Sequence, residues 1–357
     1  MKKIIVSVTN DLTTDQRVDK VCTTLQKNGF DVLLVGRHLK NSIFINRTYK
    51  TKRLHLWFAK GFLFYAEYNI RLFFFLLFSK KDSLLSNDLD TLLANFLVSK
   101  IQQKKLIYDS HELFSEIPEL IHKPFVKSVW QKLENYLLPK LKNTYTVSQG
   151  IANYYNKKYV TNFKVVRNLP LKKEVEPHDF SLFNQEKKII LYQGAVNIGR
   201  GLELMIDTMP FLDNCIFVII GEGDVLLYLK QKIIKQYLEK QVLFLGKMTP
   251  EKLQKITPLA DIGISFEEDL GLNYHFALPN KIFDYIQAEI PVLVSDLPEM
   301  KQIVLTYQVG EIIENRTPEE LAAQIKKMLK KDFSKTLKTA KKELVWENEE
   351  QLLMSIF

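Results

Sequence analysis

Three polar segments of this sequence follow short apolar runs and hold residue types that bind anions or carry charge. His111 and Glu112 follow the run in KLIYDSHELF, where a His-Glu pair is more often a cap or a surface hydrogen bond than a catalytic pair. The segment QGAVNIGRGLE holds Gly194 and Arg200, and a Gly-x-Gly turn begins at Gly221. Glycine lets a backbone approach a diphosphate, and arginine can pair with two of its oxygens. Taken singly, each of these motifs is a weak signal.

The segment ALPNKIFDYIQA is more specific. Pro279 suits the start of a helix, so Asn280 and Lys281 are expected in its positively polarised first turn, where phosphate binds well. Asp284 follows one turn later on the same face, where a carboxylate could accept both hydroxyls of a ribose. The segment therefore predicts a helix that binds a nucleotide.

Parallel sheets are the elements that would bring these segments together. Short β-branched runs alternate with amphipathic stretches along both halves of the chain, which indicates an α/β fold. Ligands of such folds bind outside the carboxyl ends of the strands, where all four segments lie. We expect helices at 18–27 and 92–100, and strands at 4–8, 31–36, 83–86, 105–109, 144–148, 188–192, 215–220, 242–245, 262–265 and 291–295.

Length and composition set the frame for this fold. A chain of 357 residues suits two domains, and residues 167–187 have the proline and charge content of a connection between them. Only Cys22 and Cys215 are present, so a disulfide framework is not expected and a reducing compartment, the cytoplasm, fits better. The most apolar run, 72–78, is far shorter than the roughly 20 residues that span a bilayer, so no transmembrane helix is predicted.

Charge is unevenly distributed along the chain. Residues 1–164 carry 26 Lys and Arg against 13 Asp and Glu, although the net charge of the whole chain is only +9. This basic N-terminal half could bind anionic lipid or a phosphate-bearing substrate, or its charge could serve only to keep the protein soluble. Nucleic acid is not expected, because the aromatic residues cluster in apolar runs. The aromatic segment 54–78 suits a membrane boundary, but its residues could also be two helices whose apolar faces pack on the first sheet, the interpretation favoured for most of them.

The order and spacing of the motifs resemble glycosyltransferase family four, the retaining enzymes of the GT-B fold. The resemblance includes DQRV at 15–18, the Asp-x-His-Glu-Leu segment, RNLP at 167–170, the C-terminal loops, and Trp346-Glu347 in the last helix. It implies two Rossmann-like parallel-sheet domains facing across a cleft. Residues 1–165, with a returning helix at about 341–357, would form the acceptor domain, and residues 166–340 would bind the nucleotide sugar.

The resemblance also implies a function. A sugar would pass from a nucleoside diphosphate sugar to an acceptor glycan or lipid-linked sugar, with retention of configuration, in cell-surface polysaccharide or glycolipid synthesis. Neither a metal nor a cofactor is required, and the enzyme would be cytoplasmic, with peripheral contact to the inner face of the membrane left open. The implied catalytic residues are His111, Arg200 and Lys281; the donor site adds Gly194, Gly221, Asn280 and Asp284, and Asn10, Arg17 and Glu112 would line the cleft.

Three departures from the family pattern keep two alternatives open. Ala195 stands where the family usually has arginine, Phe276 stands at the first position of its frequent glutamate pair, and residues 9–14 lack its glycine-rich loop. The alternatives are a nucleotide-sugar 2-epimerase of the same fold and a catalytically degenerate scaffold subunit. Donor hydrolysis or sugar transfer by the purified chain alone would distinguish these hypotheses.

Overall fold

The structure is a computed structural model that describes residues 1–117, 120, 123–172 and 186–357. The chain divides into two units. Unit 1 comprises Met1–Asn168 with Glu349–Phe357, and unit 2 comprises Leu169–Asn348. The last helix, α14 (Trp346–Met354), begins in unit 2 and ends in unit 1. Of the expected connection at 167–187, residues 173–185 lie outside the described part of the chain.

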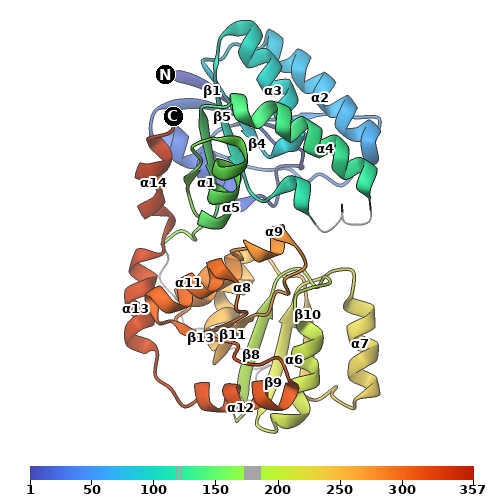
Figure 1. Cartoon of the computed structure of the whole chain (residues 1–357), viewed down its shortest axis with the longest axis vertical. Helices are drawn as coiled ribbons and strands as arrows, with labels where there is room; N and C mark the ends of the chain where they lie inside the picture. The colour runs from blue at the N-terminus through green and yellow to red at the C-terminus, as the bar shows by residue number, and fades with distance from the viewer. Residues whose placement is uncertain (118–119, 121–122, 173–185) are drawn as a thin grey trace. The chain divides into compact units, whose positions relative to one another are not determined.

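Unit 1 is built on a seven-stranded parallel sheet with the order β3-β2-β1-β4-β5-β6-β7 (Figure 1). The order reverses between β1 and β4, which is the switch point where ligands of such sheets bind. The strands are β1 (Lys2–Ser7), β2 (Phe30–Arg37), β3 (Lys50–Leu54), β4 (Ser83–Asn87), β5 (Lys105–Ser110), β6 (Asn143–Thr146) and β7 (Lys164–Val165). The helices are α1 (Gln16–Lys27), α2 (Gly61–Phe78), α3 (Leu89–Gln102), α4 (Pro124–Leu137) and α5 (Gln149–Tyr159).

Unit 2 repeats this plan with a six-stranded parallel sheet of order β10-β9-β8-β11-β12-β13. Its switch point lies between β8 and β11. The strands are β8 (Lys188–Gln193), β9 (Cys215–Ile220), β10 (Val242–Gly246), β11 (Ile262–Ser265), β12 (Val292–Val294) and β13 (Gly310–Ile312). The helices are α6 (Leu202–Thr208), α7 (Leu226–Lys235), α8 (Pro250–Ile256), α9 (Leu272–His275), α10 (Asn280–Gln287), α11 (Pro298–Tyr307), α12 (Pro318–Met328) and α13 (Ser334–Glu343).

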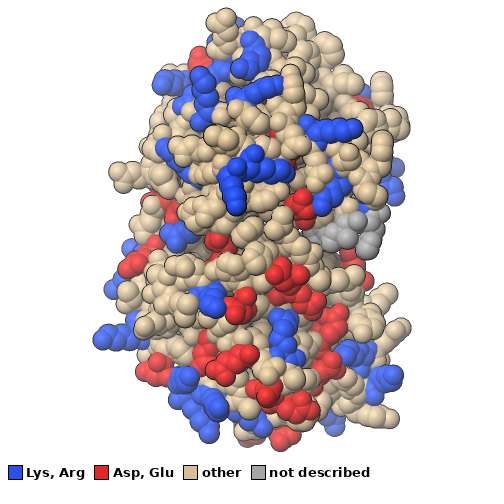
Figure 2. Space-filling view, viewed as in Figure 1, with Lys and Arg blue, Asp and Glu red and all other residues tan. Residues whose placement is uncertain are grey.

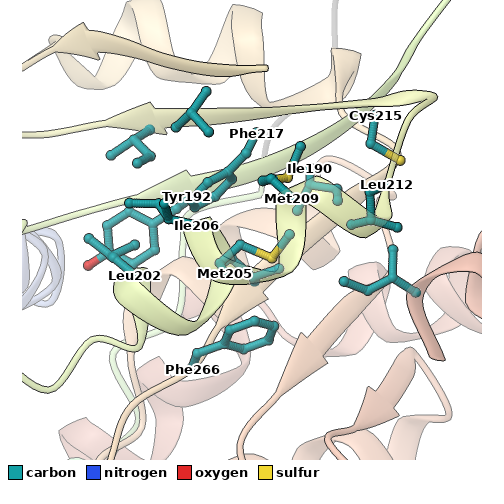
Figure 3. Packing of buried hydrophobic residues seen from close by; sticks show 14 of the residues in the cluster. Ile190, Tyr192, Leu202, Met205, Ile206, Met209, Leu212, Cys215, Phe217 and Phe266 are labelled. Carbon is teal, nitrogen blue, oxygen red and sulfur yellow. The ribbon is translucent and has the colours of Figure 1, made fainter. Parts of the chain in front are cut away.

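The prediction of two parallel-sheet α/β domains is therefore confirmed. Apolar side chains pack on both faces of the unit 2 sheet. One cluster, drawn in Figure 3, joins Tyr192 and Phe217 of the strands to Leu202 and Met205 of α6. Such clusters fix the strand ends, and with them the loops that carry the polar segments.

Helix α2 extends well beyond the apolar run at 72–78. The apolar run at 72–78 is the end of an 18-residue helix, and within the described residues this is the one helix long and apolar enough to cross a membrane. Of the segment 54–78, for which two helices were one expectation, residues 61–78 form one helix, which includes the polar residues Glu67, Asn69 and Arg71. A stripe of Phe64, Tyr68, Leu72 and Leu76 is buried against the first sheet, so α2 is a core helix of unit 1.

Candidate functional site

A buried carboxylate organises the candidate donor site of unit 2. Glu267 follows strand β11, is fully buried, and accepts hydrogen bonds from Lys281 Nζ at 2.9 Å and Arg200 Nη1 at 3.3 Å. Ser265 Oγ donates to its other oxygen at 2.6 Å. The structure thus brings together Arg200 from the loop before α6 and Lys281 from the first turn of α10, two residues that the sequence analysis selected separately.

Electrostatics keeps this cluster charged. Burial alone would raise the pKa of Glu267, but Lys281 and Arg200 outweigh it and hold that pKa below its ordinary value. Burial would likewise lower the pKa of Arg200, but Glu267 raises it. Lys281 Nζ also lies 4.1 Å from the centre of the Tyr192 ring, a cation–π contact. The two cations are therefore preorganised, while their charge is partly offset by one carboxylate.

Two glycines let the backbone close over this cluster. Gly194 follows strand β8 with φ +140°, and a Cβ there would lie 3.6 Å from Lys281 Cε. A Cβ on Gly221, which follows β9 with φ +155°, would lie 1.8 Å from the Gly194 carbonyl oxygen, so no other residue fits this position. Gly221 must be glycine because its backbone approaches that of Gly194, whereas Gly194 is favoured as glycine by its positive φ and lies beside Lys281.

The predicted nucleotide helix is α10, which begins at Asn280 as expected. Lys281 is buried, whereas Asn280 and Asp284 are exposed on the same face of the helix. Asp284 Oδ2 accepts a hydrogen bond from Gln193 Nε2 at 3.0 Å, and Thr257 Oγ1 donates to Gln193 Oε1, the side-chain amide oxygen, at 2.9 Å. Gln193 thus orients the Asp284 carboxylate beside Gly194. An exposed, oriented carboxylate suits the ribose of a nucleotide, and Lys281 of the same helix suits its diphosphate.

In unit 1, His111 is held between two carboxylates. Its backbone N–H donates to Asp88 Oδ1 at 2.8 Å, and Nδ1 lies 3.3 Å from Asp88 Oδ2. Its other ring nitrogen, Nε2, lies 3.2 Å from Asp109 Oδ2. Asp109 is fully buried and also accepts two hydrogen bonds from Arg17, each at 2.9 Å. Strand β5 ends at Ser110, so His111 lies at the carboxyl edge of the sheet.

This arrangement fixes the protonation state of His111. Burial alone would lower the pKa of His111, but Asp88 and Asp109 raise it to about 10. Burial would raise the pKa of Asp109, but Arg17 and His111 lower it to about 2. At neutral pH His111 is an imidazolium without a lone pair, so it can donate hydrogen bonds and stabilise negative charge but cannot act as a general base.

The structure assigns supporting positions to the other residues expected to line a site. Arg17, expected to line the cleft, is only 3% exposed and bonds Asp109 and the Val166 carbonyl, so it holds Asp109 beside His111. The Asn10 side chain shapes a turn by bonding Asp15 and the Leu12 N–H. Glu112 is half-buried, and its carbonyl accepts a hydrogen bond from Ser110.

Two carboxylates of these sites escaped the sequence analysis. Glu267 and Asp88 both stand just past a buried strand, and that position was the available signal. The family spacing instead places the first glutamate of its pair at Phe276, which carries no charge. Among the described residues, no group of three or more His, Cys, Asp or Glu side chains is placed to hold a metal ion.

Comparison with known proteins identifies unit 2. Residues 175–344 match the family described as glycosyl transferases group 1. Unit 2 is therefore similar to the domain of glycosyl transferases group 1. Glu267, Arg200 and Lys281 all lie within the matched residues.

One curated relative and two solved structures are similar to the chain. An uncharacterized glycosyltransferase of Methanocaldococcus jannaschii, MJ1607, is 26% identical over 40% of the chain, a match that covers only 36% of that relative's length. Sucrose-phosphate synthase from Thermosynechococcus elongatus has a TM-score of 0.79 at 13% identity, covering 100% of this chain and 98% of that one. Anabaena Alr3699/HepE in complex with UDP-glucose has a TM-score of 0.71 at 13% identity, covering 99% of each chain. At such identities the solved structures show the shared fold, and the family match to unit 2 supports glycosyl transfer.

Proposed function

We propose that the chain transfers a sugar from a nucleoside diphosphate sugar to an acceptor glycan or lipid-linked sugar, with retention of configuration and without a metal ion. The observation that carries this proposal is the pair of cations, Arg200 and Lys281, held together at the carboxyl edge of the unit 2 sheet by Glu267. The family match and the UDP-glucose complex of the similar Anabaena protein support a donor of this class.

The chemistry follows from what the reaction requires. The donor loses a nucleoside diphosphate, so the barrier falls when positive groups stabilise the departing diphosphate. Arg200 and Lys281 would supply that charge, Gly194 and Gly221 the close backbone, and Asp284 with Asn280 the contacts to the nucleoside. His111, as an imidazolium, would donate to the transferred sugar.

His111 must exchange a partner to do so, because both ring nitrogens face carboxylates. Asp88 is 22% exposed and is the replaceable partner, whereas Asp109 is buried and held by Arg17. A sugar hydroxyl would therefore compete with Asp88 for Nδ1. The pathway that we propose for the product, cell-surface polysaccharide or glycolipid synthesis, rests on the family resemblance.

The test is direct. The purified chain is titrated with a panel of nucleoside diphosphate sugars by thermal shift, and the best donor is incubated with and without acceptor in the presence of EDTA. Transfer with an unchanged anomeric configuration, read by NMR, supports the proposal. A free epimerised sugar formed without acceptor identifies a 2-epimerase, and binding without turnover under all conditions identifies a scaffold subunit.

A further inference from the structure

Helix α2 of unit 1 is apolar on two opposite sides. Its inner stripe, Phe64, Tyr68, Leu72 and Leu76, lies in the core. The opposite side of the helix carries a second stripe that is open to solvent, and its members are between 53% and 81% exposed: Leu63, Ile70, Phe74 and Phe78. Soluble proteins place polar residues on the outer side of a core helix, so a second apolar stripe indicates a partner.

A fixed turn before α2 adds two aromatic side chains to this surface. Phe62 is 74% exposed in the first turn of the helix, and Trp57 is 86% exposed just before it. The Trp57 backbone is not loose, since its N–H donates to both Glu67 carboxylate oxygens, at 3.0 and 2.9 Å. Arg71 Nε donates to Glu67 Oε1 at 2.7 Å, and Arg71 Cζ lies 4.6 Å from the centre of the Trp57 ring. The Trp57 side chain is therefore exposed to solvent on a backbone segment that Glu67 fixes in place.

Helix α4 continues the surface. It contacts α2 through Tyr65 and Trp130, whose ring centres are 5.1 Å apart, and Figure 1 shows α2, α3 and α4 together on unit 1. Both helices start with the same pattern, a lysine, a glycine or proline, then phenylalanine and an aliphatic residue, in KGFL at 60–63 and KPFV at 123–126. Phe125 is 81% exposed.

The exposed charges around these helices are almost all positive. In segments 54–81 and 123–142 the acidic residues are Glu67 and Glu134. The Glu67 side chain is 10% exposed and paired with Arg71, and that of Glu134 is 1% exposed and paired with Lys158. The exposed basic residues of the two segments are Lys60, Lys80, Lys123, Lys132, Lys140 and Lys142. Blue side chains likewise predominate over red ones on the face of unit 1 seen in Figure 2.

We propose that this face of unit 1, the outer stripe of α2 with Trp57, Phe62 and the start of α4, binds the surface of a membrane that contains anionic lipid. Exposed aromatic and aliphatic side chains flanked by lysines suit the boundary between headgroups and acyl chains. The helix lies on the bilayer and does not span it, because its inner stripe belongs to the core of unit 1. A second copy of the chain is a poorer occupant, because pairing this face with itself would bring its lysines together.

Membrane binding makes a lipid-linked acceptor the preferred substrate class, an extension that rests on the proposed glycosyl transfer. Binding to vesicles does not depend on that function and is measured without any donor. The full chain is floated with vesicles of phosphatidylcholine alone or with phosphatidylglycerol, at low and high salt. We expect binding to the anionic vesicles and about tenfold weaker partitioning at high salt, since screening weakens electrostatic attachment.

Two double variants and two matched controls identify the surface. Phe62→Ser with Phe78→Ser and, separately, Lys60→Glu with Lys80→Glu should each reduce partitioning at least tenfold. The controls change exposed residues of unit 2 in the same way: Leu227→Ser with Tyr237→Ser, and Lys235→Glu with Lys240→Glu. These should bind like the unaltered chain. Circular dichroism melting verifies that all four fold.

Several results would overturn the proposal. One is failure of the unaltered chain to bind anionic vesicles at low salt, and another is an equal loss of binding in the control variants. A third would be that the unaltered chain is a dimer in light scattering and does not bind vesicles, while Phe62→Ser with Phe78→Ser is a monomer. That result would make the face a protein interface. Nucleotide binding in the absence of vesicles is measured alongside, so failure of the donor site is distinguished from failure of the membrane surface.

Discussion

Replacing Glu267 by glutamine removes one negative charge from the centre of the candidate donor site. Glu267 is fully buried and pairs with Lys281 at 2.9 Å and Arg200 at 3.3 Å. Breaking a buried pair from one side costs about 3–5 kcal/mol. Glutamine keeps an oxygen that can accept from Lys281 or Ser265, so we expect the lower end of this range. For a unit of this size, about 3 kcal/mol lowers Tm by about 6–12 °C.

The same substitution should strengthen binding of a diphosphate. In the unaltered protein Glu267 competes with any bound anion for both cations, whereas in Glu267→Gln the cations have lost that partner. We expect inorganic pyrophosphate to bind the variant about tenfold more tightly, a difference of about 1.4 kcal/mol. Saturating pyrophosphate should therefore recover part of the lost Tm. Lower stability together with tighter pyrophosphate binding would show that the Glu267 carboxylate occupies the cations in the absence of a bound anion.

The pH dependence provides an independent measurement. The folded-state pKa of Glu267 lies below its ordinary value of 4.5, so its ion pairs contribute stability that is present above pH 4.5 and is lost as pH falls through the folded-state pKa. The stability difference between the two proteins should therefore be constant near pH 7 and shrink below about pH 4.5. Scanning fluorimetry with and without pyrophosphate measures all three effects. The neighbouring half-buried Glu268, changed to Gln, is the control.

An unchanged Tm in Glu267→Gln would refute the buried-pair argument. A loss of stability without tighter pyrophosphate binding would refute the assignment of Arg200 and Lys281 to the diphosphate, because freeing them would then have had no consequence. Equal effects in Glu268→Gln would show that the loop, not the buried charge, is responsible.

Three further predictions concern single residues of the two sites. Arg200→Ala and Lys281→Ala should each reduce turnover at least tenfold, about 1.4 kcal/mol or more in transition-state stabilisation, and unchanged kinetics in both would disprove the donor-site assignment. Asp284→Asn should weaken nucleoside diphosphate binding in calorimetry, because an amide offers one acceptor oxygen where the carboxylate offers two; equal affinity would show that Asp284 has no ligand role. His111→Gln should impair transfer with nearly intact nucleotide affinity. Its folded-state pKa of about 10 exceeds the ordinary 6.5, so the stability from its ion pairs is full below pH 6.5 and disappears as pH rises toward 10. Melting curves of His111→Gln should therefore vary less over that range than those of the unaltered chain, and parallel curves would contradict the ion pairs.

The fold was predictable because its signal is local. Buried parallel strands such as 215–220 and 262–265 are continuous apolar runs, and their bounds match the structure. Strand β3, with the sequence KTKRL, was missed because it is a polar edge strand without an apolar run. The outer stripe of α2 was equally hidden, because a sequence shows that a segment is apolar but not which sides of the helix the core covers.

The site was predictable only in part, because charge pairing is set in three dimensions. Arg200 and Lys281 could be selected from turns and helix starts, whereas the only signal for their common partner Glu267 was its position just past a buried strand. The segment between Glu267 and α10 includes helix α9 and folds back on itself, so counting along the family spacing led to Phe276. In unit 1, similarly, Asp88 comes from the end of β4 and meets His111 only because β4 and β5 are neighbours in the sheet.

The two units hold their cations by the same device. In each, a fully buried carboxylate at the carboxyl edge of the sheet, Asp109 or Glu267, pairs with one buried cation and one partly exposed cation. The buried partners are Arg17, 3% exposed, and Lys281, 8% exposed, while His111 and Arg200 are 21% and 26% exposed. Asp109 raises the pKa of Arg17 and of His111, and Glu267 raises the pKa of Arg200, despite their burial. If Arg200 turns from Glu267 to a diphosphate, Lys281 still pairs with the buried carboxylate. If His111 exchanges Asp88 for a sugar hydroxyl, Asp109 still pairs with Arg17. Binding of a ligand by either partly exposed cation therefore leaves no buried charge unpaired.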